Sequence, residues 1–485
     1  MRVKFGEWTP DQPDFENIGL EECLNVIPSE TGHYEPFAAL SPLTASLPAV
    51  VRAAISVRAV DGTGYLFASN DKELYRQSAA AWANVSRTAS YSSDTTSRWD
   101  FAQFGDAVYA VNGIDTMQFY NLGTPTRFLD MSASASAPIA KYITPVRDFL
   151  FAANVSTAVN QVQWSRINNP TRWTPSVRYQ SDFQNLPSGG EVQGLTGGDF
   201  DVVLCEETIY RMSYIGSPLV FRFDDLSPGV GCAAPGSVAR FQNVTFFYSR
   251  SGFYAFEGNQ ALPIGDNRID DWFRDNASTG DLDKMTSSID PVRKLYMVSF
   301  VSKSGGGVHD MSLIFNWATQ RWARLNVGYP VLFSAYTTGA TLDSLDTAYP
   351  SIDAMGVSFD SDQFKGGLQY FAGFNTGNQV GEFTGSALTA TLETGDGQIN
   401  PEARTFVRGV RPLIEGNSST KITCSVGKRD RLIDSVSFTS ASALNSNGWC
   451  PVRANARYHR VKMEISGSFT HASSFDFESV RDGRR

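Results

Sequence analysis

The stretch Val244-Thr245-Phe246-Phe247-Tyr248, followed by the turn Ser251-Gly252 and then by Phe253-Tyr254-Ala255-Phe256, has the pattern of a β-hairpin. Aromatic and β-branched residues favour strands, and a Ser-Gly turn lets the chain reverse between them. Six further stretches follow the same plan, at residues 64–76, 107–120, 149–164, 201–211, 295–317 and 370–383. The starts of the seven hairpins lie mostly 41 to 53 residues apart.

This spacing is the length of chain that a four-stranded blade needs. The sequence therefore predicts an all-β fold, a β-propeller of six or seven blades over residues 51–400. Each blade would bury its apolar faces only against its neighbours, so the ring must close. Two stacked β-sandwiches are the alternative, but they give no reason for an even spacing.

Helical periodicity is confined to residues 267–284, where Ile269, Trp272 and Phe273 predict one short amphipathic helix inserted between strands. Asp270 and Asp271 could be imagined as a pair of catalytic carboxylates. Adjacent residues on a helix diverge by about 100°, however, and cannot flank one bond. Both are therefore interpreted as charges on the solvated face.

The two ends of the chain differ from this repeat. Residues 1–50 carry six prolines, too many for regular structure, and are predicted to be an extended N-terminal arm. Residues 401–485 show longer alternating strands and are predicted to be a C-terminal β module. In the stretch 457–465, Val461 and Met463 lie on the apolar face, while Arg460 and Lys462 lie on a face expected to be wet and charged.

Charge is distributed unevenly along the 485 residues. The chain has 41 Lys and Arg against 50 Asp and Glu, a net charge of −9, which argues against a protein that coats nucleic acid. Residues 402–485 contain 14 basic and 8 acidic residues, a net of +6, which leaves −15 for residues 1–401. Such a molecule could dock its basic end on an acidic surface of a copy or a neighbour, or both regions could simply be solvated.

Motifs for catalysis, metal binding or cofactor binding are missing from the sequence. The five cysteines include no C-x-x-C pair, the four histidines are far apart, and no nucleophile elbow, Walker loop or dinucleotide fingerprint occurs. The sequence therefore predicts no enzyme, no cofactor and no metal. Residues 92–99 and 165–173 approach the Asp-box of sialidase-type propellers but lack its key residues, and are interpreted as turns anchored by an aromatic side chain.

Export and membrane signals are also missing. No apolar run approaches the roughly 20 residues of a membrane span, and the first residues lack a signal peptide, so synthesis and folding in a cytoplasm are expected.

Two basic clusters are candidate contacts for DNA phosphates or for a partner protein. The first is expected at a hairpin tip and the second in a tail. Their residues are Lys428, Arg429 and Arg431, and Arg481, Arg484 and Arg485.

Several short motifs together resemble the tail-tube nozzle proteins of short-tailed bacteriophages, also called tail tubular protein B or packaged-DNA stabilisation proteins. The likeness spans nearly the full length, although each motif is short. The motifs are Leu24-Asn25-Val26-Ile27-Pro28, Trp164-Ser165, Asn169-Pro170-Thr171-Arg172-Trp173, Gly427-Lys428-Arg429-Asp430, Gly448, Arg457-Tyr458-His459-Arg460, Ile465-Ser466-Gly467 and Asp482-Gly483-Arg484-Arg485.

The resemblance implies a structural virion protein of the tail, with no catalytic residues. It implies a homo-hexameric ring below the portal and adaptor proteins, with tail fibres or spikes as neighbours and the host cell surface as a possible distal contact. Double-stranded DNA would be retained in the lumen and pass through it during ejection, without sequence specificity. The alternative function is a carbohydrate-binding or glycan-cleaving propeller used in host attachment. That alternative predicts exposed tryptophans or paired carboxylates in the central funnel.

Overall fold

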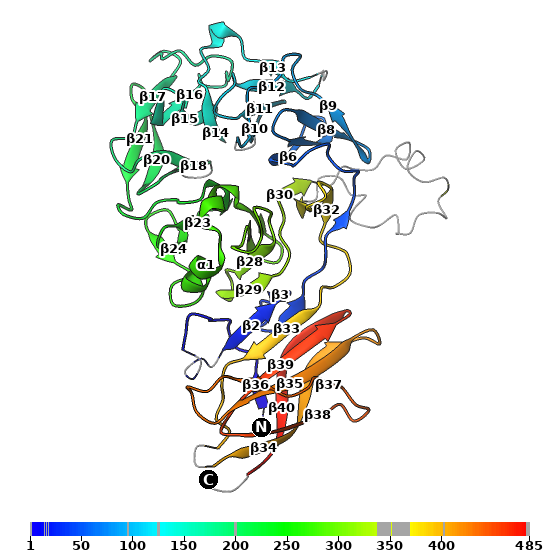
Figure 1. The fold of residues 1–485 in the computed structure, drawn as a ribbon. Coiled ribbons are helices and arrows are strands. Elements are labelled where there is room, and N and C mark those ends of the chain that lie inside the picture. Colours follow the sequence, from blue (N-terminus) through cyan, green and yellow to red (C-terminus); the bar gives the residue numbers. More distant parts are fainter. Residues whose placement is uncertain are drawn as a thin grey trace.

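The computed structural model describes all residues except 1, 14, 16, 18, 95–96, 124–126, 198–200, 337–350, 352–368, 401–402 and 482–485. The chain is almost entirely β, in two parts that Figure 1 shows one above the other. A ring of sheets occupies the upper part of the view, and a second, elongated β structure that contains both ends of the described chain lies below it.

The ring consists of seven antiparallel four-stranded blades, which confirms the predicted propeller and sets its blade number. Blade 1 consists of β6 (Ala53–Arg58), β7 (Gly64–Ser69), β8 (Leu74–Ser78) and β9 (Ala81–Asn84). Blade 2 consists of β10 (Asp100–Phe104), β11 (Ala107–Val111), β12 (Gln118–Asn121) and β13 (Leu129–Asp130). Blade 3 consists of β14 (Ala140–Val146), β15 (Phe149–Val155), β16 (Ala158–Trp164) and β17 (Asp182–Asn185). Blade 4 consists of β18 (Val192–Thr196), β19 (Asp201–Cys205), β20 (Ile209–Gly216) and β21 (Val220–Asp225). Blade 5 consists of β22 (Ala239–Phe241), β23 (Val244–Ser249), β24 (Gly252–Phe256) and β25 (Ala261–Pro263). Blade 6 consists of β26 (Thr286–Asp290), β27 (Leu295–Phe300), β28 (Met311–Asn316) and β29 (Arg321–Leu325). Blade 7 is β30 (Val331–Tyr336), β31 (Gln369–Phe374), β32 (Val380–Glu382) and the N-terminal strand β5 (Ser41–Pro42).

The seven predicted hairpins are the two middle strands of the seven blades. These strands are covered on both faces by neighbouring blades, and every residue of β11, β15, β19 and β27 is buried. Such strands read as continuous apolar runs, whereas strands at the sheet edges are short and half-exposed. The hairpin pattern in the sequence therefore comes from the two middle strands of each blade.

The ring closes in two ways. A cluster of buried apolar residues lies between each blade and the next all the way round, including Leu66 of blade 1 against Phe333 of blade 7. In addition, β5 completes blade 7 by pairing Ser41 with Glu382 and Pro42 with Gly381. A strand that precedes the first blade in the sequence thus completes the last blade. The described blades therefore each pack against a neighbour on both faces.

The second structure, called the C-terminal module below, consists of residues 390–481 and the N-terminal strands that join them. One of its sheets is β3 (Val26–Pro28), β4 (Tyr34–Pro36), β40 (Phe469–Arg481), β34 (Thr405–Gly416) and β38 (Cys450–Ala456), with β1 (Arg2–Lys4) on β40. The other is formed by β2 (Leu20–Leu24), β33 (Ala390–Thr394), β39 (Tyr458–Ser466), β35 (Lys421–Arg429), β36 (Ser437–Phe438) and β37 (Ser442–Ala443).

The first 50 residues do not form a separate extended arm. They supply five strands, four to the C-terminal module and one to blade 7. Three of these strands, β3, β4 and β5, end at Pro28, Pro36 and Pro42. Proline lacks the N–H that would continue a ladder, so the prolines limit the length of the strands without preventing them. The module also begins at Ala390, upstream of the predicted boundary at 401.

A continuous sheet joins the two parts. Strand β29, the last of blade 6, pairs in parallel with β2, which pairs in turn with β33 of the C-terminal module. At this seam Arg324 donates two hydrogen bonds to the carboxylate of Glu22, at 2.6 and 2.5 Å. The largest apolar cluster runs without interruption from blades 5 and 6 into the module. Propeller and module therefore share one sheet and one apolar core.

The predicted helix is shorter than residues 267–284. It comprises α1 (Asp270–Asn276) followed by the 3-10 turn η3 (Thr279–Lys284). Two further 3-10 turns of the described residues are η1 (Ala133–Ala135) and η2 (Pro235–Ser237). Ile269 and Phe273 are buried as expected, and Asp271 is exposed.

The interpretation of Asp270 as a solvated charge is wrong. Its side chain is buried and accepts a hydrogen bond from the Phe253 N–H at 3.0 Å. A Cβ at Gly252 or Gly265 would lie 2.0 to 2.1 Å from this carboxylate, so two glycines make the room for it. Burial raises the pKa of Asp270 to about 6.

Candidate functional site

The first predicted contact cluster lies at the end of β35 and in the hairpin that follows it. Lys428 is half-buried on the strand. Arg431 is exposed, with 72% of its side-chain surface accessible, and its Nη2 lies 2.7 Å from Oδ1 of Asp434. An exposed pair three residues apart contributes little to stability. The hairpin therefore presents Arg431 to solvent as a group that another molecule could contact.

Arg429 cannot make the predicted surface contact, because it points inward. Its side chain is 8% exposed and forms an ion pair with Asp396, which is 1% exposed. Arg460 of the neighbouring strand β39 donates from Nε to the same carboxylate at 2.7 Å and from Nη1 to Glu393 at 3.3 Å. Two guanidinium groups thus meet two carboxylates in the interior of the module.

This buried ion cluster was missed at the level of sequence. Arg460 was placed on a wet face but is 7% exposed, whereas Glu464 of the same strand is exposed. Burial raises the pKa of Glu393, and its hydrogen bond to Arg460 opposes that shift. Buried charges need partners, so the cluster stabilises the module only while all its members are present.

The second predicted cluster is only partly described. Arg481 is exposed at the end of β40, opposite Thr405 at the start of β34. The neighbouring Arg404 forms an ion pair with Asp430 of the β35 hairpin at 3.1 Å. Lys428, Arg431 and Arg481 therefore lie at one end of the module. Arg484 and Arg485 lie outside the described residues.

The centre of the propeller is bridged by Arg98, which precedes the first strand of blade 2. Its Nη1 donates to the carbonyl oxygens of Asp283 at 3.1 Å and Met285 at 2.6 Å, at the entrance to blade 6. Blades 2 and 6 are not neighbours in the ring, so the side chain crosses the hub. A Cβ at Gly236, between blades 4 and 5, would lie 2.1 Å from the same nitrogen. Elements from three parts of the ring thus converge on one guanidinium.

Two further polar groups lie near Arg98. Asp100 of blade 2 accepts a hydrogen bond from the Ile143 N–H of blade 3 at 2.8 Å, and burial raises its pKa to about 6. His309 Nε2 lies 2.8 Å from the carbonyl oxygen of Lys284, which can only accept, so this nitrogen carries the proton. Burial lowers the pKa of His309 to about 4, which leaves the imidazole neutral at pH 7.

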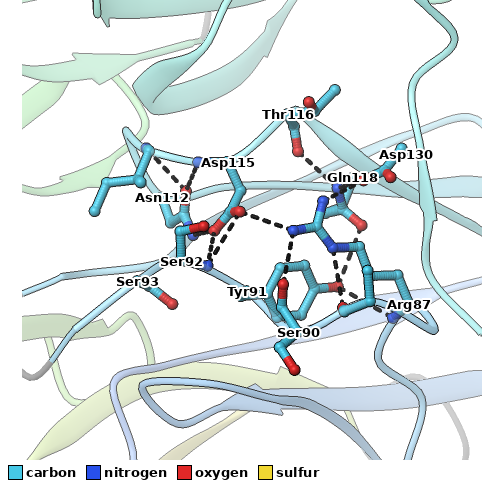
Figure 2. A network of polar contacts seen from close by, with 12 residues as sticks. Arg87, Ser90, Tyr91, Ser92, Ser93, Asn112, Asp115, Thr116, Gln118 and Asp130 are labelled. Atoms are coloured by element: carbon cyan, nitrogen blue, oxygen red, sulfur yellow. Dashed lines mark hydrogen bonds and ion pairs between the residues drawn. The ribbon is translucent and has the colours of Figure 1, made fainter.

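Blades 1 and 2 are joined by a compact polar network around Arg87, which Figure 2 shows. Its guanidinium lies 2.8 Å from Asp115 and 2.6 Å from Asp130, and stacks 4.6 Å from the ring centre of Tyr91. Asp115 also accepts from the Ser92 N–H at 2.9 Å. The network holds the connection between the two blades in one conformation.

Both Asp-box-like stretches have a buried tryptophan at their end; residues 95–96 of the first stretch lie outside the described part. In the first, Trp99 packs edge-on against Tyr91 with ring centres 4.8 Å apart. In the second, Trp173 is fully buried and donates from Nε1 to the Pro170 carbonyl at 2.8 Å, while Asn169 accepts from the Thr171 hydroxyl at 2.8 Å. Their side chains are used in packing and turn formation.

The five cysteines are free and buried. Within the described residues no group of three or more His, Cys, Asp or Glu side chains is placed to hold a metal ion. Of the helices described, none has the length and apolarity to cross a membrane.

The geometry defines a class: a closed seven-bladed β-propeller that shares one sheet and one core with a second β module. No protein-family model and no curated protein matches the chain.

Solved structures with a similar fold include BamB from Moraxella catarrhalis, which is 8% identical over 74% of this chain and 94% of that one, with a TM-score of 0.37. BBS1N in complex with ARL6DN is 9% identical over 73% and 96% of the two chains, with a TM-score of 0.40. YCF48 bound to D1 peptide is 11% identical over 60% and 84%, with a TM-score of 0.33. These similarities add nothing on function.

Proposed function

We propose that this chain is a non-enzymatic structural subunit of a short-tailed bacteriophage virion, the nozzle of the tail, where six copies form a conduit for packaged DNA. The sequence motifs suggested this role. The observation that carries it is the single sheet that runs from blade 6 through β2 into the C-terminal module. A subunit built on one continuous sheet transmits load without hinging, as the wall of a pressurised channel must.

The DNA path would lie between subunits and not along the axis of one propeller. The hub cavity has a volume of only about 440 Å³, too little for a duplex whose major groove alone is about 12 Å wide. Arg98 also crosses the hub. Each propeller would thus be a solid block, and the lumen would be the space that six blocks enclose.

Charge would govern what each surface contacts. Six copies of a chain with net charge −9 carry about 54 excess negative charges, and acidic walls would let DNA pass because they make few phosphate contacts. The basic residues of the stretch 402–485, which has a net charge of +6, would dock on an acidic surface of the adaptor or portal protein, leaving other surfaces to tail fibres or spikes and to the host surface. Because exposed charges are screened by salt, dissociation of rings from the adaptor should increase with ionic strength.

Electron microscopy of the purified protein tests the proposal. Six-fold rings with an open axis are expected. A protein that is monomeric at every concentration, or that forms a trimeric spike, would contradict the proposed conduit.

The alternative, a glycan-binding or glycan-cleaving propeller, predicts tryptophans or paired carboxylates in the funnel. Among the described residues that line the hub cavity there is no tryptophan, and Asp283 contributes the single carboxylate. Turnover of host glycans by the pure protein would decide for the alternative.

A further inference from the structure

The hub cavity gathers positively charged groups from opposite sides of the ring. Arg52 lies before the first strand of blade 1, Arg98 before that of blade 2, and Lys284 before that of blade 6. His309, from the loop between β27 and β28, also lines the cavity. The other polar lining residues are Asp283, Ser97, Thr376 and Asn378. The cavity volume of about 440 Å³ falls in the range of small-molecule sites, roughly 300–1,000 Å³.

Lys284 and Arg52 each contact a carboxylate directly, whereas within the described part of the chain Arg98 forms no ion pair. Lys284 Nζ lies 2.7 Å from Asp281, and Arg52 is hydrogen-bonded through Nε to Asp71. Arg98 is held by two carbonyl oxygens. Carbonyl groups satisfy donors but do not neutralise charge, and the carboxylates of Asp100 and Asp283 act on Arg98 electrostatically without forming an ion pair with it.

Donors remain available on both guanidinium groups. The two hydrogen bonds of Arg98 use Nη1 alone, and that of Arg52 uses Nε alone. Within the described part of the chain, Nε and Nη2 of Arg98 and both terminal nitrogens of Arg52 have no protein partner. A guanidinium presents such donors as a planar fork, which matches the oxygens of a carboxylate or phosphate.

The two guanidinium groups also repel one another. Burial lowers the pKa of Arg98, Tyr142, Asp100 and Asp283 oppose that shift, and the charge of Arg52 adds a smaller lowering effect. Arg98 and Lys284 act on His309 in the same sense, after the larger effect of burial. An anion placed between the groups would remove this repulsion, whereas a cation or an apolar ligand would not.

We propose that the hub cavity is a binding site for a small oxyanion, a phosphate or a carboxylate, held between the free donors of Arg98 and Arg52. The bound anion would connect blades 1, 2 and 6 across the ring axis. The site is independent of the proposed role in a virion, because it needs only the propeller of one subunit.

Binding can be measured on the full chain by calorimetry and by thermal unfolding, with inorganic phosphate and citrate as separate probes and chloride at matched ionic strength as the blank. Saturable binding of either probe, with a rise in melting temperature, is expected. If phosphate alone binds, the site is a phosphate site. If citrate alone binds, it is a carboxylate site, and if both bind, it accepts oxyanions in general. No saturable binding of either probe in the millimolar range would overturn the proposal.

Two variants assign the site. Arg98→Gln should abolish binding, and Arg52→Gln, which leaves the Arg98 bridge in place, should weaken it at least tenfold. The matched control is Arg222→Gln on the outer strand of blade 4, where an exposed arginine lies 2.7 Å from Asp224; its affinity should equal that of the unmodified chain. If Arg98→Gln does not fold, Arg52→Gln alone decides. Unchanged affinity in Arg52→Gln would contradict the assignment.

Discussion

The propeller and the C-terminal module are built from the chain in opposite ways. Six of the seven blades consist of four consecutive strands, whereas the module combines strands from residues 2–36 with strands from residues 390–481. The blades therefore depend on local pairing, and the module depends on contacts between the two ends of the sequence. N-terminal strands complete both parts, at blade 7 and at the seam of β2 with β29. We therefore expect changes at these two places to destabilise the fold most.

Deleting residues 1–43 should have the largest effect. It removes β5 from blade 7, β2 from the seam and three strands from the module, which exposes apolar faces of both parts. We expect loss of cooperative unfolding in thermal melts followed by circular dichroism. Deleting residues 1–4 removes only the exposed edge strand β1 and should leave the transition cooperative. A cooperative, native-like melt of the longer deletion would show that the ring closes without β5.

Within the module, Arg429 and Arg431 should behave differently although they are two residues apart. Arg429→Ala removes a partner from the buried Asp396 and should lower the free energy of unfolding by about 3 kcal/mol. Arg431→Ala removes an exposed charge and should change it by less than about 0.5 kcal/mol. Urea unfolding measures both values. Equal effects would show that Arg429 is not an interior residue.

At the seam, Arg324→Met should lower the free energy of unfolding by about 2 kcal/mol, because it leaves the half-buried carboxylate of Glu22 without its two hydrogen bonds. The control is Arg222→Met, which breaks an exposed pair on blade 4 and should cost less than about 0.5 kcal/mol. Chemical denaturation compares the two variants. A cost at the seam no larger than that of the control would mean that the pair does not join the two parts.

An effect of similar size is a pH dependence at blade 5. Because burial raises the pKa of Asp270 from 3.8 in the unfolded chain to about 6, the folded state holds the proton more tightly between those values. The contribution of this group to stability is therefore present below about pH 4 and lost as the pH rises through about 6.

Asp270→Asn should remove this dependence and stabilise the protein at pH 7 by roughly 2 kcal/mol. The exposed Asp271→Asn is the control, and melting temperatures across pH 4 to 7 make the comparison. An unchanged pH profile in Asp270→Asn would contradict the assigned burial effect.

The sequence predicted the local part of this fold and missed the non-local part for a physical reason. The hairpin 244–256 and its six counterparts can be recognised in the sequence because their strands are apolar and their turns are short. Arg429 instead looks like a hairpin-tip charge, since its partner Asp396 lies on a distant strand. Asp270 looks solvated, because nothing near it in sequence shows that Gly252 makes room for its carboxylate. Arg98 gave no signal, since its acceptors are backbone carbonyls of residues 283 and 285.

The most direct measurement is a cryo-electron microscopy reconstruction of the virion tail that carries this chain. We predict six copies around the DNA path, each fitted by propeller and C-terminal module in the single relative orientation seen here, with the duplex running between subunits. Density for DNA through the hub of one propeller, subunits in which the module swings relative to the ring, or the chain located only in fibres would contradict the account.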